Sequence, residues 1–371
     1  MGISTITAGR IRKGQILGQL GEDFITEMEQ FSHLGLVKTY CTDHQTSDSA
    51  ATATALLCGV KTSLGTIGLD GRASRANCLS SHGAHVDSIL DWAKELGHPV
   101  GIVVTSRITH ASPASAYAHS PERNWEGYDS INFGAKQAAQ GCVDIAHQLM
   151  LQSPPIDILF GGGRRFFYPT QKPDVANSSL YGARTDNISL IDEFWKGSRI
   201  DHGHHFTQAR YALDDYVEFD NTIGQVKRIL QEKGVLNDTL LVVTADHSHS
   251  FSFGAGSARG SNIFGFGTLD NANVSTVDKM PVHIITYGNG PNFAATRNKA
   301  YFDSIDFNRT EYKWPAANPM VEATHAGEDV AVFAQGPWSH LFIGTMEQHT
   351  ISHKMAYAAC WGAYKTRQGC K

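Results

Sequence analysis

A serine at the start of an alanine-rich run is the first residue whose type and setting could do chemistry. Asp48 and Ser49 open the run DSAATATA, which reads as the beginning of a helix. Backbone N–H groups and the helix dipole at such a start favour anions. A serine hydroxyl there could attack phosphorus if a metal ion lowered its pKa. The alternative is that this Asp-Ser pair only caps the helix.

Further clusters have the residue types of metal ligands. Asp201 and His205 are four apart, so on a helix they share one face and could reach one ion. Asp246 and His247 follow an apolar run, and such a pair leaving a buried strand is costly unless it is paired or metal-bound. His325 could complete the Asp201/His205 set and leave one position open, as in catalytic zinc sites. A charged surface patch or capped loops are the alternatives.

A further cluster has groups that suit phosphate. The run 109–113 reads THASP and contains His110 and Ser112, and Arg123 follows it. An arginine fork matches two phosphate oxygens, although a lone arginine is most often a surface residue. Each cluster follows or precedes a predicted strand, and ligands of open α/β sheets bind beyond the strand ends. We therefore interpret the clusters together as one site.

The elements that must position these residues alternate between short β-branched runs and longer amphipathic runs, which indicates a parallel α/β sheet. The predicted strands are Gly35–Cys41, Pro99–Thr105, Ile156–Phe160, Thr239–Thr244, Val282–Tyr287 and Asp329–Phe333. The predicted helices are Ser49–Leu57, His85–Leu96, Phe133–Leu151 and a long one after His205. The run from Tyr168 to Ser198 is polar and reads as a loop region. We find no repeat and no linker, so we expect one domain.

Composition excludes several classes of protein. The 371 residues are 41% hydrophobic, enough for a sizeable core. The net charge is -5, with 31 basic against 36 acidic residues and no basic block, so we expect no nucleic-acid partner. No apolar run approaches the roughly 18 residues of a membrane span.

Two features of the sequence indicate different cellular locations. The chain opens with Met1-Gly2 and a polar, helix-compatible stretch, with no apolar signal core before it. Five Asn-x-Ser/Thr sequons suit a glycosylated, secreted protein, and they begin at Asn177, Asn187, Asn237, Asn273 and Asn308. We therefore expect an exported chain whose signal is missing from this sequence.

Long, collinear motifs closely resemble the metazoan alkaline phosphatases. The matching runs are DSAATATALLCGVK, THASPASAYAH, GGGR, RIDHGHH, VTADHSHSFSFG and THAGEDVAVF. The resemblance covers nearly the whole chain. It implies a three-layer α/β/α sandwich with a central, largely parallel sheet. It also implies hydrolysis of phosphate monoesters by a glycosylated homodimer tethered outside the cell, through a lipid (GPI) anchor and not a membrane span.

The resemblance implies a role for each matching residue. Ser49 would be the nucleophile that becomes phosphoserine, Arg123 would clamp two phosphate oxygens, and His249 would contact substrate. Two zinc ions (Zn²⁺) and one magnesium ion (Mg²⁺) are implied. The first zinc would be held by Asp201, His205 and His325; the second by Asp246, His247 and Ser49; and the magnesium by Ser112 with His110 beside it. The resemblance, with the sequons, also implies disulfides Cys78–Cys142 and Cys360–Cys370, leaving Cys41 and Cys58 free.

Two departures from the family pattern concern metal ligands. The family has a Gly-Asp-Gly-Met-Gly turn whose Asp bridges two of the metals, and this sequence begins at its Met-Gly. Where the family has a glutamate magnesium ligand, this sequence has Lys196. The run between Gly163 and Asp201 is also shorter, so the family's peripheral calcium site has no counterpart. We expect residues 1–371 to form a single alkaline phosphatase-like domain that lacks the first strand and part of the segment between 164 and 198.

Three interpretations follow. The first is zinc- and magnesium-dependent hydrolysis of phosphate monoesters through a phosphoserine intermediate. The second, which the two absent ligand carboxylates favour, is a catalytically impaired phosphatase-like protein that binds metal or phosphate or partners intact subunits; we expect little turnover from residues 1–371. The third is a sulfatase or nucleotide phosphodiesterase of the same superfamily, which does not explain THASPASAYAH.

Overall fold

The computed structural model of the chain describes residues 1–191, 207–267, 274–293, 297–309 and 311–370. These fall into two compact units. Unit 1 contains Met1–Val37 and the described part of His204–Thr345, and unit 2 contains the described part of Lys38–Gly203 with Met346–Lys371. Each unit is described by itself.

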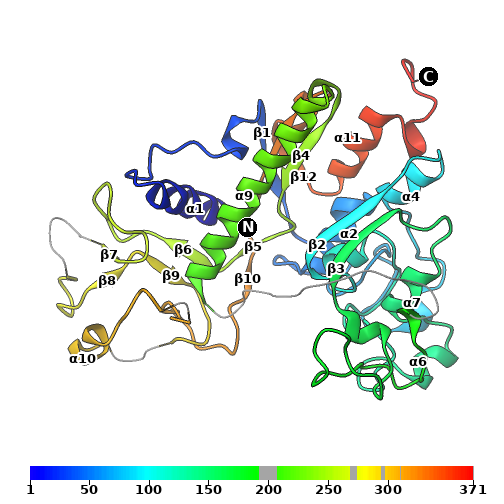
Figure 1. Ribbon diagram of the computed structural model, residues 1–371, viewed down its shortest axis with the longest axis horizontal. Helices are drawn as coiled ribbons and strands as arrows, with labels where there is room; N and C mark the ends of the chain where they lie inside the picture. Colours follow the sequence, from blue (N-terminus) through cyan, green and yellow to red (C-terminus); the bar gives the residue numbers. More distant parts are fainter. Residues whose placement is uncertain (192–206, 268–273, 294–296, 310, 371) are drawn as a thin grey trace. The chain divides into compact units, whose positions relative to one another are not determined.

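The described helices and strands follow one another along the whole chain (Figure 1). The helices are α1 (Ile3–Ile16), α2 (Ser49–Cys58), α3 (Cys78–Ser81), α4 (Ile89–Lys94), α5 (Ala111–Ala114), α6 (Ala135–Ala139), α7 (Ile145–Met150), α9 (Ala209–Glu232), α10 (Lys299–Asp303) and α11 (Thr350–Ala359). The strands are β1 (His33–Lys38), β2 (Gly101–Arg107), β3 (Ile158–Gly162), β4 (Leu241–Thr244), β5 (Ser248–His249), β6 (Phe251–Phe253), β7 (Phe266–Gly267), β8 (Val282–His283), β9 (Ile285–Tyr287), β10 (His325–Ala326), β11 (Val330–Gln335) and β12 (Gly344–Glu347).

Unit 1 is built on a sheet in which β11 lies between β1 and β4, antiparallel to both. The helices α1 and α9 lie side by side in this unit (Figure 1). The long helix α9 buries an apolar stripe that includes Leu213, Tyr216 and Ile223. Its Asp220 is fully buried, and Lys13 of α1 neutralises it at 2.6 Å. This buried ion pair therefore fixes how the two helices pack.

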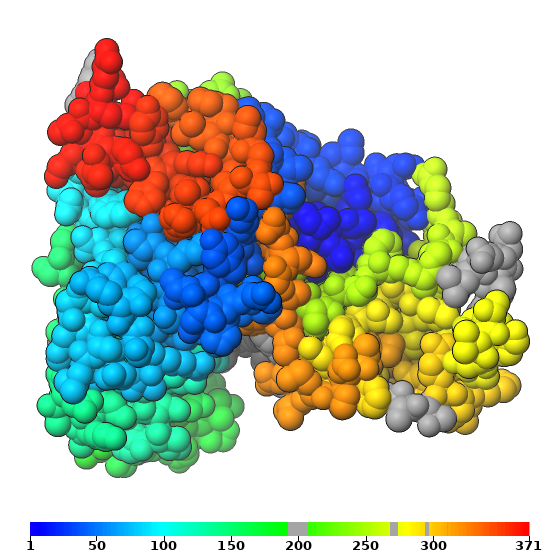
Figure 2. Space-filling view, turned by 180° about the vertical axis from the view of Figure 1, so that it is seen from behind, coloured from blue at the N-terminus to red at the C-terminus, as the bar shows by residue number. Residues whose placement is uncertain are grey.

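Unit 2 has the parallel pair β2–β3 and a core that includes residues of α2, α5 and α7. The C-terminal segment, red in Figure 2, lies against the cyan segment around α4, and His98 packs on Trp361 at 5.6 Å between ring centroids. Arg184 is a fully buried cation in this unit. It donates to Asp144 at the start of α7 (2.9 Å) and to Asp186 (2.5 Å).

The α/β class is confirmed, but the sheets of the described residues are mixed where we expected a largely parallel sheet. Strands β1, β11 and β4 pair antiparallel, while β2 and β3 pair parallel. The physical reason is that β11 is buried on both faces and so has the continuous apolar run typical of parallel strands, although both of its neighbours run antiparallel to it. The pairing of strands far apart in sequence decides strand direction.

Two predicted elements are broken in the structure. The predicted helix Phe133–Leu151 is two short helices, because Gly141 adopts a positive φ of 89° and Asp144 caps a new helix start at His147 N–H. The predicted strand Val282–Tyr287 splits at Ile284, because β8 pairs with β7 while β9 pairs with β6. The helix α11 had no prediction.

The cysteine predictions are confirmed: Cys78 is bonded to Cys142 and Cys360 to Cys370, and Cys41 and Cys58 are free and buried. Among the described residues, no helix combines the length and apolar character required to cross a lipid bilayer.

Candidate functional site

Ser49 is the first residue of α2 in unit 2, as the sequence predicts. The preceding Asp48 is the N-cap, with extended backbone, and its Oδ1 accepts the Ala51 N–H at 3.2 Å. The helix ends at Gly59, whose φ of 73° is left-handed. Ser49 itself is 8% exposed. The capping alternative and the nucleophile hypothesis therefore concern different residues: Asp48 caps, and Ser49 stands at the positive end of the helix.

Asp48 also anchors Arg123. The Asp48 Oδ2 accepts Arg123 Nη1 at 2.9 Å, and Oδ1 accepts the Gly65 N–H at 3.0 Å. Burial opposes ionisation of Asp48, but the charge of Arg123 and the N–H groups of Gly65 and Ala51 outweigh it and lower the pKa of this carboxyl. Arg123 is thus held beside Ser49 by a carboxylate that stays ionised.

His110 lies on the other side of the same guanidinium. Its Nε2 is 3.4 Å from Arg123 Nη2, and it is the residue just before α5, which contains Ser112. The loop in front of α5 is braced by Glu126, which accepts Arg107 Nε at 2.8 Å and Thr109 Oγ1 at 2.7 Å. The structure therefore brings Ser49, Arg123, His110 and Ser112 into one region of unit 2.

Two histidines stack in unit 1. The ring centroids of His247 and His325 are 3.6 Å apart at 24°, and His249 meets the edge of His325 at 5.9 Å. The ladder between β5 and β10 causes this, because it pairs His325 with His249. Asp246 Oδ2 lies 3.5 Å from His247 Nε2. Three imidazoles and a carboxylate from distant parts of the sequence therefore meet.

The orientation of His247 is set by the backbone. Its Nδ1 lies 2.8 Å from the Ser248 carbonyl oxygen, so Nδ1–H donates there and Nε2 carries the lone pair that a metal requires. The hydroxyl of Ser248 donates to Glu328 Oε1 at 2.5 Å. The Met1 ammonium donates to the His247 carbonyl oxygen at 2.5 Å. Burial lowers the pKa of that amino group, and the nearby carboxylates of Asp246 and Glu328 offset this only in part.

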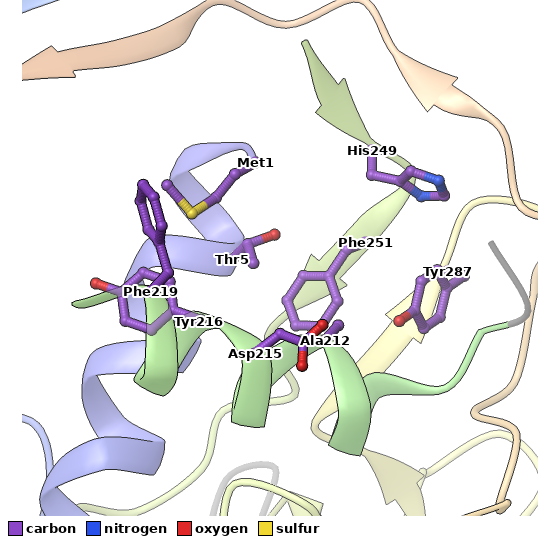
Figure 3. Close-up of a pocket in the computed structure, with 9 residues that line it drawn as sticks. All are labelled: Met1, Thr5, Ala212, Asp215, Tyr216, Phe219, His249, Phe251 and Tyr287. Atoms are coloured by element: carbon purple, nitrogen blue, oxygen red, sulfur yellow. The ribbon is translucent and has the colours of Figure 1, made fainter. Parts of the chain in front are cut away.

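Below His249 lies a cavity of about 320 Å³. Figure 3 shows its lining, with α1 on one side, α9 beneath and the rings of Phe251 and Tyr287 beside His249. The Phe251 and Tyr287 rings meet edge to face at 5.6 Å. Burial raises the pKa of Tyr287 well above its ordinary value, so its hydroxyl stays protonated and can only donate or accept a hydrogen bond. The cavity is mostly apolar with one imidazole at its rim.

The donor chemistry of unit 1 fits zinc. Imidazole nitrogen and carboxylate oxygen are the ligands that a catalytic zinc takes together, and the hydrogen bond from His247 Nδ1 orients its Nε2 as the nitrogen that could ligate. In unit 2 the donors beside Ser49 are hydroxyls, an imidazole and a guanidinium, which suit an oxyanion and a hard cation.

The sequence predictions divide between the units. Ser49, His110, Ser112 and Arg123 lie in unit 2, and Asp246, His247, His249 and His325 lie in unit 1. Asp201, His205 and Lys196 lie outside the described residues. Sequence reasoning missed the anchoring role of Asp48 and the pairing of Ser248 with Glu328. Both were visible as polar residues inside the long motifs, Asp48 before Ser49 and Glu328 after His325.

A profile of the family "Alkaline phosphatase" matches residues 1–197 and 194–361. The human tissue-nonspecific alkaline phosphatase is 38% identical over 442 aligned positions, covering 98% of this chain and 82% of the relative. The alkaline phosphatase of Gadus morhua is 38% identical, covering 98% and 90%. The human alignment is longer than the 371 residues of this chain, so that relative has segments that this chain lacks.

Solved structures agree on the fold. The alkaline phosphatase of the Antarctic bacterium TAB5 has a TM-score of 0.58 at 22% identity and covers 98% of this chain and 95% of its own. That of Thermus thermophilus has a TM-score of 0.60 at 15% identity, covering 96% and 89%. A mutant of the TAB5 enzyme has Mg bound in a site called M3.

Proposed function

This chain belongs to the alkaline phosphatase family of metal-dependent enzymes that hydrolyse phosphate monoesters, and we propose that it does so through a phosphoserine at Ser49. The observation that carries the proposal is the placement of Ser49 at the start of α2, next to a guanidinium that Asp48 holds. A helix start and an arginine fork are both complementary to phosphate.

The proposed reaction has two displacements at phosphorus. The Ser49 Oγ gives up its proton to solvent and forms a bond to phosphorus while the bond to the ester oxygen breaks, and the leaving alkoxide takes a proton from water. A water oxygen then forms a bond to phosphorus while the bond to Ser49 Oγ breaks; one proton of that water replaces the proton on Ser49 Oγ, and phosphate is released. Each in-line step inverts phosphorus, so the configuration is retained overall.

Arg123 is the residue that orients the phosphoryl group. Its guanidinium has five N–H donors, and among the described residues Asp48 and His110 are the side chains it contacts. The remaining donors can hold two phosphate oxygens. The pair with Asp48 fixes the plane of the fork before substrate arrives, which lowers the entropic cost of binding.

Two zinc ions and one magnesium ion complete the proposal. When bound, they would lower the pKa of the Ser49 hydroxyl and of water and stabilise the entering and leaving oxygens. In unit 1, Asp246 and His247 would be ligands of one zinc and His325 would be a ligand of the other. Ser112 would hold the magnesium, with His110 beside it.

Trapping tests the role of Ser49. The protein is mixed with labelled phosphate, quenched in acid and mapped by mass spectrometry. We expect phosphate on Ser49, and the Ser49→Ala variant should lose both the label and turnover of p-nitrophenyl phosphate, by roughly 10⁴-fold or more. Ser63→Ala, a matched removal of a hydroxyl in the same unit, should keep both. Label on another residue contradicts the assignment.

A second candidate function rests on Lys196, which stands where the family has a glutamate ligand. An ammonium cannot ligate a metal, so a chain that binds phosphate or metal with little turnover is the rival. Assay of residues 1–371 with zinc and magnesium separates the two: turnover close to that of an intact relative removes the rival. Lys196→Glu should raise turnover if the rival holds.

We also propose an extracellular, glycosylated homodimer whose membrane attachment is a lipid anchor. Four sequon asparagines, Asn177, Asn187, Asn237 and Asn308, are exposed. The two disulfides suit an oxidising compartment. Mass shifts on glycosidase treatment of protein from a secreting host test the first point, and light scattering tests the dimer.

A further inference from the structure

Three potential ligands of different chemistry converge in unit 2, in the loop between β1 and α2. The Cys41 thiol, the Asp43 carboxylate and the His44 imidazole each offer one donor atom, and these atoms all lie within 4.8 Å of one another. The Cys41 Sγ is 3.2 Å from Asp43 Oδ1, and His44 Nδ1 is 3.0 Å from the same oxygen. None of these residues belongs to the phosphate or metal sites proposed above.

Two of these three separations are close to those of a tetrahedral zinc site. Zinc bonds of about 2.3 Å to sulfur and about 2.0 Å to nitrogen or oxygen place neighbouring ligand atoms roughly 3.3–3.6 Å apart. The Cys41–Asp43 and Asp43–His44 separations therefore need to open by only a few tenths of an ångström. A zinc ion with these three ligands would have one position left for water.

The loop is held in place independently of any ion. The Cys41 N–H donates to the His44 carbonyl oxygen at 3.1 Å, which closes a tight turn. The Thr42 N–H donates to the Thr62 carbonyl oxygen at 3.0 Å. The Asp43 Oδ1 also accepts the Leu64 N–H at 2.9 Å. A ligand set fixed by the backbone binds metal without paying a large ordering cost.

Access and burial also suit an ion. Cys41 is buried at 5% exposure, while the side chains of Asp43 and His44 are 44% and 51% exposed. An ion would enter from solvent between the carboxylate and the imidazole and meet the thiolate at the inner end. The alternative is that Cys41 packs as a small apolar residue and that Asp43 and His44 form an exposed ion pair worth little. In that alternative the Cys41 thiol donates a hydrogen bond to Asp43 Oδ1 at 3.2 Å, so the two interpretations differ in whether a metal thiolate forms when an ion is added.

We propose that Cys41, Asp43 and His44 bind a zinc ion that clamps the loop leading into α2. Thiolate, carboxylate and imidazole together select a borderline-soft transition metal over magnesium or calcium. Binding would release the thiol proton, because the thiolate is the ligand. The site would stabilise the approach to Ser49 without touching substrate.

Cobalt titration of the whole protein tests the site. Cobalt(II) substitutes for zinc, and a cobalt–thiolate bond gives a charge-transfer band in the near ultraviolet. The ligands proposed for the catalytic metals are oxygen and nitrogen only, so this band reports the Cys41 site alone. Failure here leaves the phosphatase proposal standing, and loss of phosphatase activity leaves this band in place.

We expect the band in wild-type protein, its loss in Cys41→Ser, and cobalt affinity at least about 10-fold weaker in His44→Asn. Cys58→Ser is the matched control, because Cys58 is the other free buried cysteine, and it should keep the band. His44 is half exposed, so His44→Asn decides the question if Cys41→Ser does not fold. No band in the wild type, a band that survives Cys41→Ser, or unchanged affinity in His44→Asn overturns the proposal.

Discussion

The regions around Ser49 and around His325 hold charged and polar groups in different ways. In unit 2, the Arg123 charge is met by Asp48 at 2.9 Å, and Asp48 is further held by two backbone N–H groups. In unit 1, His247 and His325 stack at 3.6 Å with Asp246 and Glu328 close by. Two imidazoles face to face repel if both are protonated. The first region holds a cation against a carboxylate, whereas the second gathers imidazole and carboxylate groups of the types that ligate zinc.

This difference indicates that one region recognises phosphate and the other binds metal. A guanidinium clamped by an ionised carboxylate is a preorganised receptor for an anion, ready before substrate binds. The imidazoles and carboxylate of unit 1 are the donor types that a zinc ion takes together. Mutations in the two regions should therefore separate metal content from phosphate recognition.

Of the variants that test this comparison, one in unit 1 should have the largest effect. His325→Ala removes a proposed zinc ligand and the stacking partner of His247, so zinc content and turnover of p-nitrophenyl phosphate should fall together. We expect turnover to drop at least about 100-fold, because even changes to the outer partners of a ligand cost 10–100-fold. Elemental analysis and the assay are read on the same preparation. His340→Ala, which removes an exposed imidazole of the same unit, should change neither, and full zinc content in His325→Ala contradicts the comparison.

A smaller effect with the opposite signature is expected in unit 2. Arg123→Lys keeps the charge but loses the fork, so kcat/KM should fall about 10- to 100-fold, the value of charge-assisted hydrogen bonds of about 1.5–3 kcal/mol. Zinc content should stay unchanged. Arg72→Lys is the control, since Arg72 is 70% exposed and pairs only with Asp70 among the described residues. Loss of zinc in Arg123→Lys would mean that the two regions are not separable.

The smallest effect concerns acid stability. His283 of unit 1 packs among aromatic rings, and burial, helped by the charge of Arg297, lowers its pKa from 6.5 to about 4. Because the folded-state pKa is lower, the unfolded state takes up a proton first as the pH falls below 6.5. Stability that is fully present above pH 6.5 is therefore lost progressively as the pH falls from 6.5 through 4. From these two values, the loss at pH 5 is about 2 kcal/mol.

Urea unfolding at pH 7 and pH 5 measures this loss. Wild-type protein should lose free energy of unfolding between pH 7 and pH 5, and His283→Gln should lose less of it, because a glutamine does not take up a proton. His85→Gln is the matched control in unit 2. Partial burial and the neighbouring histidines lower the pKa of His85 too, but the residue is exposed overall, so solvent screens the effect. An equal response of both variants would show that burial of His283 is not the cause.

Much of the architecture could be predicted from sequence because its signals are local. Apolar residues three and four apart predicted the long helix α9, and an Asp cap before an alanine run predicted α2. The direction of β11 between β1 and β4 could not be predicted, since it depends on pairing across most of the chain. The break of the predicted helix Phe133–Leu151 was visible in Gly141 but was outweighed by the surrounding helix formers.

The candidate site, like the fold, was predicted only in its local features. The residue types and motifs identified Ser49, His247 and His325, whereas the contacts that orient them are non-local. The bond from Arg123 to Asp48 joins residues 75 positions apart, and the His325–His249 pair depends on a two-residue ladder. No spacing rule predicts either. Cys41, Asp43 and His44 lie within four residues of one another in the sequence, yet only the backbone turn brings their donor atoms together.

The buried Arg184 decides how the segment that carries Asn177 responds to a protease. Its backbone pairs with Tyr168 and Thr170, and its guanidinium reaches Asp144 and the Phe166 carbonyl oxygen, so the segment is closed at its base. Detaching the base would strand the buried Asp144 carboxylate, at a cost of roughly 3–5 kcal/mol. A cut at the exposed tip should therefore leave a nicked molecule whose two pieces stay together until denatured.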